Sequence, residues 1–133
     1  MIEMELAKIR IDDRREEQVI VLKEKKGERS LPIIISIFEA SAIKLEISGL
    51  KPPRPLTHDL LRQTIEQMGG KIDHVVVTEL KDNTFYARII IKKNNNEIVE
   101  VDARPSDSIA LAVRAKTPIY VVEEVLKQVA SIN

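Results

Sequence analysis

The chain has 133 residues, 44% of them hydrophobic and 32% charged, which fits a single domain over residues 1–133 around one core. Its formal net charge is zero, which excludes attraction to nucleic acid or anionic membranes through overall charge, so any phosphate binding must be local. It has no cysteine, which excludes disulfides, thiolate metal sites and a cysteine nucleophile.

The N-terminal segment MIEMELAKIRI carries acids where a signal peptide needs basic residues followed by an apolar run. No apolar stretch reaches the roughly 18 residues that a membrane span requires. We therefore expect a cytoplasmic protein that does not enter a membrane. The frequent use of Lys, Glu and Ile without cysteine is compatible with a thermophilic source.

Three strands are predicted at the start of the chain, in MELAKIRI, EEQVIVLKEK and LPIIIS, with KKGERS connecting the last two as a hairpin. A helix follows over SIFEASAIKLEIS, with Ser36 as its N-cap and Gly49 just past its end. The prolines of the next segment, LKPPRP, cannot continue a helix, so we expect a stiff connector there.

The second part of the chain begins with a helix over THDLLRQTIEQMGG, which Thr57 can cap and Gly69 or Gly70 can end. Its apolar stripe comprises Leu60, Leu61, Thr64, Ile65 and Met68. Strands KIDHVVVTEL and TFYARIIIKK follow, joined at Asp82 and Asn83, which tolerate positive φ. After a turn at 94–96 we expect strand EIVEVDA, helix PSDSIALAVRA, short strand PIYVV, and an amphipathic helix with Val125, Leu126, Val129 and Ile132.

These elements predict an α+β fold with about four helices and a mixed, largely antiparallel sheet or sheets. SIFEASAIKLEI and ARPSDSIALAVR each follow a hairpin strand. Aligning Glu39 with Asp107 also aligns Ala42 with Ala110 and Glu46 with Arg114. Duplication of a hairpin-strand-helix unit is one interpretation, and unrelated elements are the other, because few identities support the alignment.

The helix over 105–115 is apolar nearly all round, with Asp107 and Arg114 close together opposite the face of Ile109. We therefore expect a largely buried helix with one charged edge. Its polar start suits a functional site. The structural alternative is helix capping, which we favour for Ser106. In that case Ser106 and Asp107 complement the free backbone N–H groups and the helix dipole at the start of the helix.

Acidic side chains near this helix could meet at a cation. Asp102 lies at the end of the preceding strand, and carboxylates from a strand end and the next helix can converge on Mg²⁺. Arg104, between them, could bind phosphate with two hydrogen bonds. The alternative for Arg104 is a structural ion pair with Asp102 or Asp107.

His58 opens its helix beside Asp59, but adjacent residues project about 100° apart, so the two do not pair with each other. The helix dipole disfavours a cationic imidazole at this end and suits a general base. Packing at the edge of the apolar stripe is the alternative. His74, in the middle of a strand, is expected to be structural.

The strand TFYARI turns Tyr86 and Arg88 to one face, where they could form the floor of a polar cleft or lie on a solvated sheet surface. No Gly-rich phosphate loop, serine nucleophile elbow or His-x-x-x-His zinc pattern is present. Most of the basic clusters are expected to be solvated hairpin tips: Lys23, Lys25, Lys26 and Arg29; Lys51 and Arg54; Lys92 and Lys93.

The motifs PPRPLTHDLL, DNTFYARI and DARPSDSIALAVR, followed by PIYV, closely resemble the bifunctional nuclease domain family, over roughly Leu6 to Val129. The resemblance implies an α+β domain and, from plant relatives, hydrolysis of both RNA and DNA. Asn83 replaces the glycine of the family pattern DGTFYA, and Ser108 replaces its usual alanine. Slightly different turn chemistry and helix start are therefore expected.

Two hypotheses follow. In the first, the chain is a nuclease for RNA and DNA, assisted by Mg²⁺ or Mn²⁺ on Asp102, Asp107 and Glu39. Catalysis then falls to His58, Asp107 and Asp102, and substrate binding to Arg54, Arg104, Ser106, Tyr86 and Arg88. In the second, the chain is a non-enzymatic module that binds a ligand or forms an oligomer, with a structural Asp/Arg network. A homodimer is expected in either case because edge strands need cover.

Overall fold

Seven strands form one mixed sheet in the computed structural model, which describes residues 1–132. The strand order is β3-β2-β1-β7-β4-β5-β6, and among the described residues only the β4–β7 pair is parallel. The strands are β1 Ile2–Arg10, β2 Glu17–Glu24, β3 Ser30–Ser36, β4 Gly70–Lys81, β5 Thr84–Lys93, β6 Ile98–Ala103 and β7 Ile119–Val121. The helices are α1 Ile37–Ser48, α2 Thr57–Gln67, α3 Pro105–Ala115 and α4 Glu123–Ile132. The predicted α+β class is confirmed.

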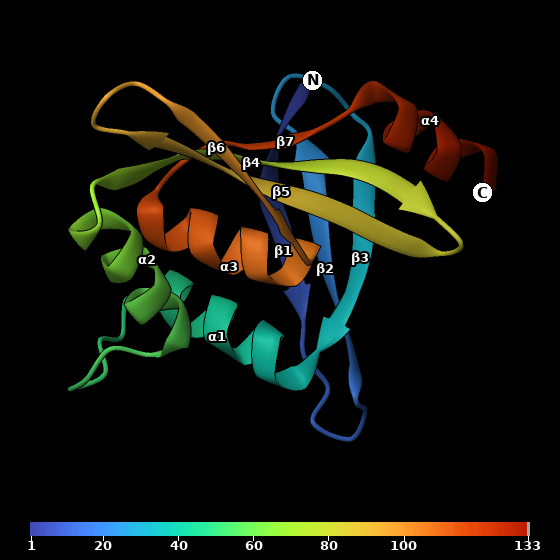
Figure 1. The fold of residues 1–133 in the computed structure, drawn as a ribbon. Coiled ribbons are helices and arrows are strands. Elements are labelled where there is room, and N and C mark those ends of the chain that lie inside the picture. Colours follow the sequence, from blue (N-terminus) through green and yellow to red (C-terminus); the bar gives the residue numbers. More distant parts are fainter. Residues whose placement is uncertain (133) are drawn as a thin grey trace.

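The same arrangement of elements occurs twice. Strands β1, β2 and β3 form an antiparallel meander that leads into α1, and β4, β5 and β6 form another that leads into α3. The first strands of the two meanders, β1 and β4, lie on either side of β7 (Figure 1). This topology is the hairpin-strand-helix repeat that the sequence alignment of Glu39 with Asp107 indicated.

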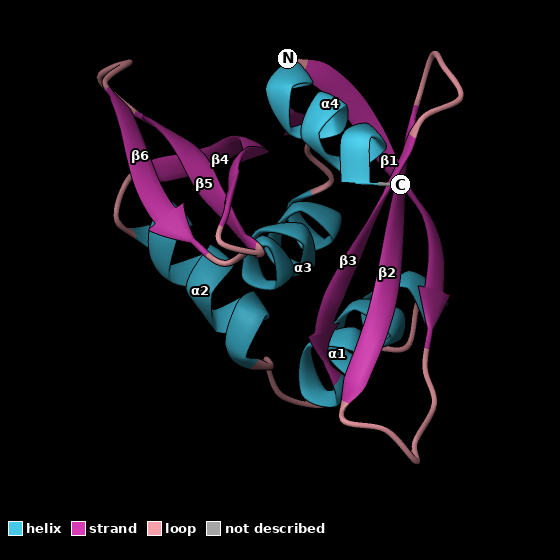
Figure 2. Cartoon of the chain, turned by 90° about the vertical axis from the view of Figure 1, so that its right-hand side faces the viewer, coloured by secondary structure: helices cyan, strands magenta, loops and turns pink. Residues whose placement is uncertain are grey.

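Helix α3 is the centre of the helical layer. It packs against α1 and α2 and against strands β4 and β5. Figure 2 shows the two strand triplets at an angle, with α3 and α4 between them. The middle of α3 is completely buried, because Ile109, Ala110, Leu111 and Ala112 each have 0% exposure. The expectation of a largely buried helix is therefore confirmed, and its alanines allow the close approach of its neighbours.

The structure confirms the predicted cap and end of the first helix and the predicted turn between β4 and β5. Ser36 caps α1, since its hydroxyl accepts a hydrogen bond from the Glu39 amide at 3.3 Å. Gly49 follows that helix in the left-handed conformation with φ of 79°. The β4–β5 turn has positive φ at Asp82 and Asn83, 53° and 62°, so asparagine tolerates the position expected to hold glycine.

Helix α2 differs from the prediction in two ways. Its N-cap is Leu56 rather than Thr57, and the Asp59 carboxylate accepts a hydrogen bond from the Leu56 amide at 3.1 Å. Its apolar stripe is not buried, since Leu60 is 58% and Met68 is 81% exposed. The predicted cap was wrong because an acid in the first turn can satisfy the same donors.

None of the described helices is long and apolar enough to span a membrane.

Candidate functional site

The beginnings of α1, α2 and α3 meet at one polar cluster. We call it the Arg104 cluster, and it consists of Glu39, His58, Arg104, Ser106 and Asp107. Arg104 binds both acids, through Nε to Asp107 Oδ2 and through Nη1 to Glu39 Oε1, each at 2.9 Å. His58 Nε2 lies 3.0 Å from Asp107 Oδ1, and Ser106 Oγ donates to Glu39 Oε1 at 2.6 Å. Residues far apart in the sequence therefore share one hydrogen-bonded network.

Helix geometry positions the two acids. Glu39 and Asp107 are each the third residue of their helices, counted from the N-caps Ser36 and Arg104. Carboxylates are favoured in a first turn because the free N–H groups and the helix dipole attract negative charge. Pro105 fits the first helical position and follows an extended Arg104 with φ of −74° and ψ of 148°. The local sequence thus holds both acids at the same end of the helical layer.

Glu39 is held by three neighbours, Ser36, Arg104 and Ser106. Its Oε2 accepts a hydrogen bond from the Ser36 amide at 2.7 Å, while Oε1 receives Ser106 and Arg104. Burial raises the pKa of Glu39, but the hydrogen bonds from Ser106 and Ser36 and the Arg104 charge outweigh it. The pKa of Glu39 is therefore below its ordinary value, and the side chain is a carboxylate at neutral pH.

Asp107 is also ionised, and this determines what His58 can do. Burial raises the pKa of Asp107, but the hydrogen bonds of His58 and Arg104 lower it further than burial raises it. A carboxylate can only accept, so a neutral His58 carries its proton on Nε2 and has a lone pair on Nδ1. His58 Nδ1 has no hydrogen bond to another group within residues 1–132, and the His58 side chain is 13% exposed.

Arg104 is the outward-facing member of the cluster, with a side chain 69% exposed. Its hydrogen bond to Asp107 and the charges of Asp107 and Glu39 raise its pKa, so it is always a cation. Nε and Nη1 bind the two acids, and Nη2 has no hydrogen bond within the described part of the chain. The two acids hold the guanidinium in place, and its Nη2 can donate a hydrogen bond to an oxyanion of a bound ligand.

A second, buried pair braces the same helices. Arg114, whose side chain is 1% exposed, donates from Nε to Asp59 Oδ1 at 3.0 Å. It also donates to the carbonyl oxygens of Ala42 on α1 at 3.1 Å and Ala110 on α3 at 3.0 Å. His58 and Asp59 therefore face different partners, as expected for adjacent helical residues. The sequence prediction did not include Asp59 in the site, although its place in the first turn of α2 was a usable signal.

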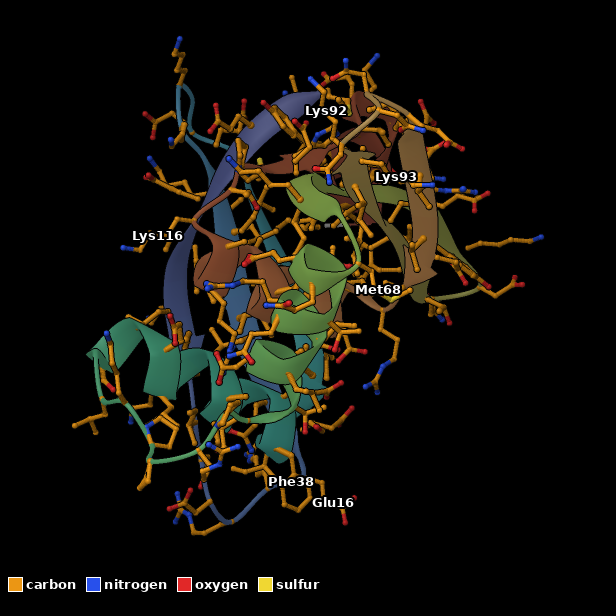
Figure 3. All side chains as sticks on the ribbon, turned by 60° about the vertical axis from the view of Figure 1, so that its left-hand side comes forward. Glu16, Phe38, Met68, Lys92, Lys93 and Lys116 are labelled. Atoms are coloured by element: carbon orange, nitrogen blue, oxygen red, sulfur yellow. The ribbon has the colours of Figure 1, made fainter. Side chains whose placement is uncertain are left out.

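An open groove of about 580 Å³ borders the cluster. Glu39, Arg104, Pro105 and Ser106 line one side of it. Strand β3, Asn83 of the β4–β5 turn and the half-buried Phe85 at the start of β5 also line it. Glu16 also lines the groove, and Figure 3 shows it at the same end of the molecule as the exposed Phe38. The groove has mixed apolar and acidic walls and reaches Glu39, Arg104 and Ser106, whereas His58 and Asp107 lie outside its lining.

Four predicted site residues lie outside the cluster. Asp102 is exposed on β6, directly across from the exposed Arg88 on β5. Tyr86, 39% exposed, is farther along β5. Arg54 is in the proline-rich connector and lines a different hollow. Residues Tyr86, Arg88 and Asp102 therefore lie on exposed strand positions, and Arg104 pairs with Asp107 rather than with Asp102.

Two further expectations from the sequence can be compared with the structure. Ser106 does not cap α3, because Arg104 is the N-cap and the buried Ser106 hydroxyl binds Glu39 instead. The long-range acid could not be foreseen from the local pattern. His74 packs its ring edge against Tyr120, with centroids 5.2 Å apart, and contacts Asp73 at 2.6 Å, which agrees with a structural role.

The proposed cation ligands are only partly brought together. Glu39 and Asp107 share Arg104, but their carboxylate oxygens already receive hydrogen bonds from protein groups. Asp102 has no hydrogen bond or ion pair among residues 1–132. In that part of the chain no group of three or more His, Cys, Asp or Glu side chains is arranged to hold a metal ion. The predicted set of Asp102, Asp107 and Glu39 is therefore not gathered into one group in the described structure.

Comparisons with known proteins identify relatives over most of the chain. Residues 20–133 match the sequence model of the family described as the bifunctional nuclease domain. The chain is 45% identical over 126 residues to an uncharacterized protein of Mycobacterium tuberculosis, covering 95% of this chain and 74% of that protein. It is 31% identical over 116 residues to bifunctional nuclease 1 of Oryza sativa subsp. indica, covering 85% of this chain and 35% of the rice protein. It is 32% identical over 105 residues to bifunctional nuclease 1 of Arabidopsis thaliana. That match covers 77% of this chain and 32% of the Arabidopsis protein. The chain therefore spans about a third of the length of these plant relatives.

Proposed function

Because the chain belongs to the bifunctional nuclease domain family, we propose that it is a nuclease that hydrolyses phosphodiester bonds of RNA and DNA. The family and the plant relatives named bifunctional nucleases support a nuclease-type function. The choice of RNA and DNA as substrates is what the resemblance to the plant members implies. The observation that carries the proposal is the His58–Asp107 contact of 3.0 Å beside the exposed Arg104.

Hydrolysis of both RNA and DNA requires water as the nucleophile, because DNA lacks the 2′-hydroxyl that could attack within RNA. His58 is the general base in this proposal. Asp107 accepts the Nε2 proton and orients the ring, so that Nδ1 is left to take a proton from the attacking water. The same nitrogen can then give its proton to the leaving oxygen. A positioned acid–base group of this kind contributes about 10²- to 10⁴-fold in rate.

Arg104 is the phosphate-binding group. Its free Nη2 and the exposed edge of its guanidinium donate to a phosphate oxygen, which stabilises the charge that develops in the transition state. Glu39 and Asp107 act on Arg104 by holding its plane, with 2.9 Å contacts from two directions. Ser106 acts on Arg104 only through Glu39, because the Ser106 hydroxyl donates a hydrogen bond to the Glu39 carboxylate.

A divalent cation stays part of the proposal as a prediction. Mg²⁺ or Mn²⁺, when bound, would neutralise charge on the phosphate and lower the pKa of a bound water. Because the predicted ligands are not gathered into one group in the described structure, none of the steps above is assigned to the cation. The cation requirement and the side-chain roles can therefore be tested separately.

The decisive assay uses the purified chain with end-labelled RNA and DNA, in Mg²⁺, in Mn²⁺ and in EDTA. We expect cleavage of both nucleic acids by the wild type and a large loss in Asp107→Asn, which keeps the shape of the side chain but not its charge. Full cleavage by Asp107→Asn would contradict the assigned roles. Absence of cleavage under all three conditions would contradict the nuclease proposal itself.

A non-enzymatic module is the second candidate, and one observation favours it. Each carboxylate oxygen of Glu39 and Asp107 already has a protein partner, as in a network that only stabilises the fold. If the cluster only stabilises the fold, Asp107→Asn lowers the free energy of unfolding and has no effect on any activity. Differential scanning calorimetry with and without oligonucleotide distinguishes the candidates, because a ligand that binds the native state raises the Tm.

A further inference from the structure

Two hollows on the face that carries α2 share one residue, Lys116. The first, of about 510 Å³, lies between the proline-rich connector and α2. The second, of about 590 Å³, lies between the end of α3 and the β4 and β5 strands. Both are lined by Lys116, and Figure 3 shows it on one side of α2, with Lys92 and Lys93 beyond the end of that helix.

The hollows are rich in cations, although the whole chain is neutral. They are lined by Lys51, Arg54, Arg62, Lys71, Lys92, Lys93, Arg114 and Lys116. The acids that line them are Glu46, Asp59 and Asp73. Of these acids, Asp59 binds the buried Arg114 and Asp73 contacts His74. By contrast, the groove beside the Arg104 cluster has three acids and a single cation on its walls.

The second hollow contains a cationic pair that the fold alone does not explain. Lys71 on β4 and Lys92 on β5 are directly opposite each other in the antiparallel ladder. Like charges in this position repel each other and lower stability. Neither lysine has an ion-pair partner within residues 1–132, whereas the neighbouring Lys93 contacts Glu97 at 3.4 Å. An anion bound between Lys71 and Lys92 would relieve the repulsion.

Lys116 itself has an unfavourable backbone conformation. It ends α3 with φ of 56° and ψ of 45°, in the left-handed region where glycine is the favoured residue. A lysine there costs conformational energy, and such positions persist where the side chain serves another purpose. Nearby, Thr117 lines the same hollow, and its Oγ1 is buried without a hydrogen-bond partner in the described residues.

We propose that these hollows form one basic track that binds the phosphate backbone of a nucleic acid strand. The basic track is defined as Lys51, Arg54, Lys71, Lys92 and Lys116, and Arg62 is left out because it pairs with Glu66 at 3.2 Å. It extends the substrate-binding role predicted for Arg54 to Lys51 and Lys92, for which a solvated hairpin tip is the alternative. The inference rests on the proposed function, because a nuclease must hold its substrate at several phosphates. The first turn of α2 connects the two sites, with Asp59 lining the track and His58 in the Arg104 cluster.

The test is binding of fluorescein-labelled oligo(dT) and oligo(U), followed by fluorescence anisotropy in EDTA at salt concentrations from about 50 to 200 mM. Lys116→Gly removes one charge and also relieves the backbone strain, so we expect its Tm to equal or exceed that of the wild type. We expect its Kd to rise on the order of threefold to tenfold, and the slope of log Kd against log salt to fall by about 0.7. Lys92→Gln should behave similarly, because it removes a repulsive pair.

Lys26→Gln is the matched control, since Lys26 is exposed in the β2–β3 turn and lines neither hollow. The track is contradicted if the wild type does not bind the oligonucleotides, or if it binds only inorganic polyphosphate. It is also contradicted if Lys116→Gly and Lys92→Gln bind like the wild type, or if Lys26→Gln weakens binding as much as they do. Cleavage assays separate the two proposals. Cleavage with unaltered binding by both variants overturns only the track, and track-dependent binding without cleavage overturns only the nuclease.

Discussion

Glu39 and Asp107 occupy the same position, the third residue, in the two helices that follow equivalent strand meanders, and both carboxylates bind Arg104. The repeated topology therefore brings two acids to one guanidinium. The halves are not interchangeable, because only Asp107 also contacts His58. The repeated arrangement thus places the two acids in equivalent positions, and only the Asp107 side also holds the imidazole.

Acid sensitivity is the first prediction. The pKa values of Asp107 and Glu39 lie below their ordinary values of 3.8 and 4.5, so the unfolded chain binds more protons when these groups titrate. Their contribution to the free energy of unfolding is complete above the ordinary values and is lost as pH falls through the lower folded values. Asp107→Asn should therefore reduce the loss of stability as the pH falls below about 4, measured by urea unfolding. Asp13→Asn, at an exposed loop position, should leave that loss unchanged.

Several parts of this structure could be predicted from sequence because local physics determines them. Ser36, Gly49, Asp82 and Asn83 act through their own backbone, and the apolar surface of the helix over 105–115 required burial whatever its neighbours were. The Asp107–Arg104 contact could also be listed as an alternative, because the two residues are three apart on the first turn.

What could not be predicted depends on which elements meet. The hydroxyl of Ser106 suits a cap, but Glu39 from α1 reaches it, and no local pattern encodes that contact. The stripe that includes Leu60 and Met68 has the period of a buried face, yet no element of the described chain covers it fully. Asp102 lies on the same face of its strand as Ile98 and Glu100, as the alternation of the sequence predicts. Because β6 is an edge strand of the sheet, that residue is exposed.

The buried Arg114 is predicted to lock the helical layer. Arg114→Met removes the cation that pairs with Asp59, whose side chain is 27% exposed, and the hydrogen bonds to Ala42 and Ala110, so the free energy of unfolding should fall by about 1 to 3 kcal/mol. Urea unfolding should show that loss. In Arg114→Met with Asp59→Asn the loss should be smaller than the sum of the two single losses, because the residues are coupled. Arg88→Met, on an exposed strand position, should change stability by no more than about 0.5 kcal/mol.

Asp102→Asn tests the predicted cation set. Asp102 has no contact with Glu39 or Asp107 in the described structure, so we expect its cleavage rate in Mg²⁺ to stay within about twofold of the wild type. The measurement is a titration of cleavage against Mg²⁺ and Mn²⁺ after EDTA treatment. A loss above about tenfold that excess Mn²⁺ restores would instead support a cation shared by all three acids.

The exposed apolar face of α2 relates to the predicted homodimer. Leu60 is 58% and Met68 is 81% exposed, and Phe38 on α1 is 84% exposed. If these residues cover each other between two copies, Met68→Asp should convert a dimer into a monomer without lowering the Tm, because the position is exposed within one chain. Light scattering after size-exclusion chromatography measures the mass. A monomeric wild type, or a dimer that Met68→Asp leaves intact, would contradict this role of the face.

The most direct test of the catalytic cluster is chemical rescue of His58→Ala. The account predicts that this variant stays folded, loses RNA and DNA cleavage by about 10²-fold or more, and regains part of it when imidazole is added. The recovered rate should depend on Asp107, because that carboxylate orients the imidazole in the wild type at 3.0 Å. Cleavage by His58→Ala at the wild-type rate, with no response to imidazole, would contradict the account.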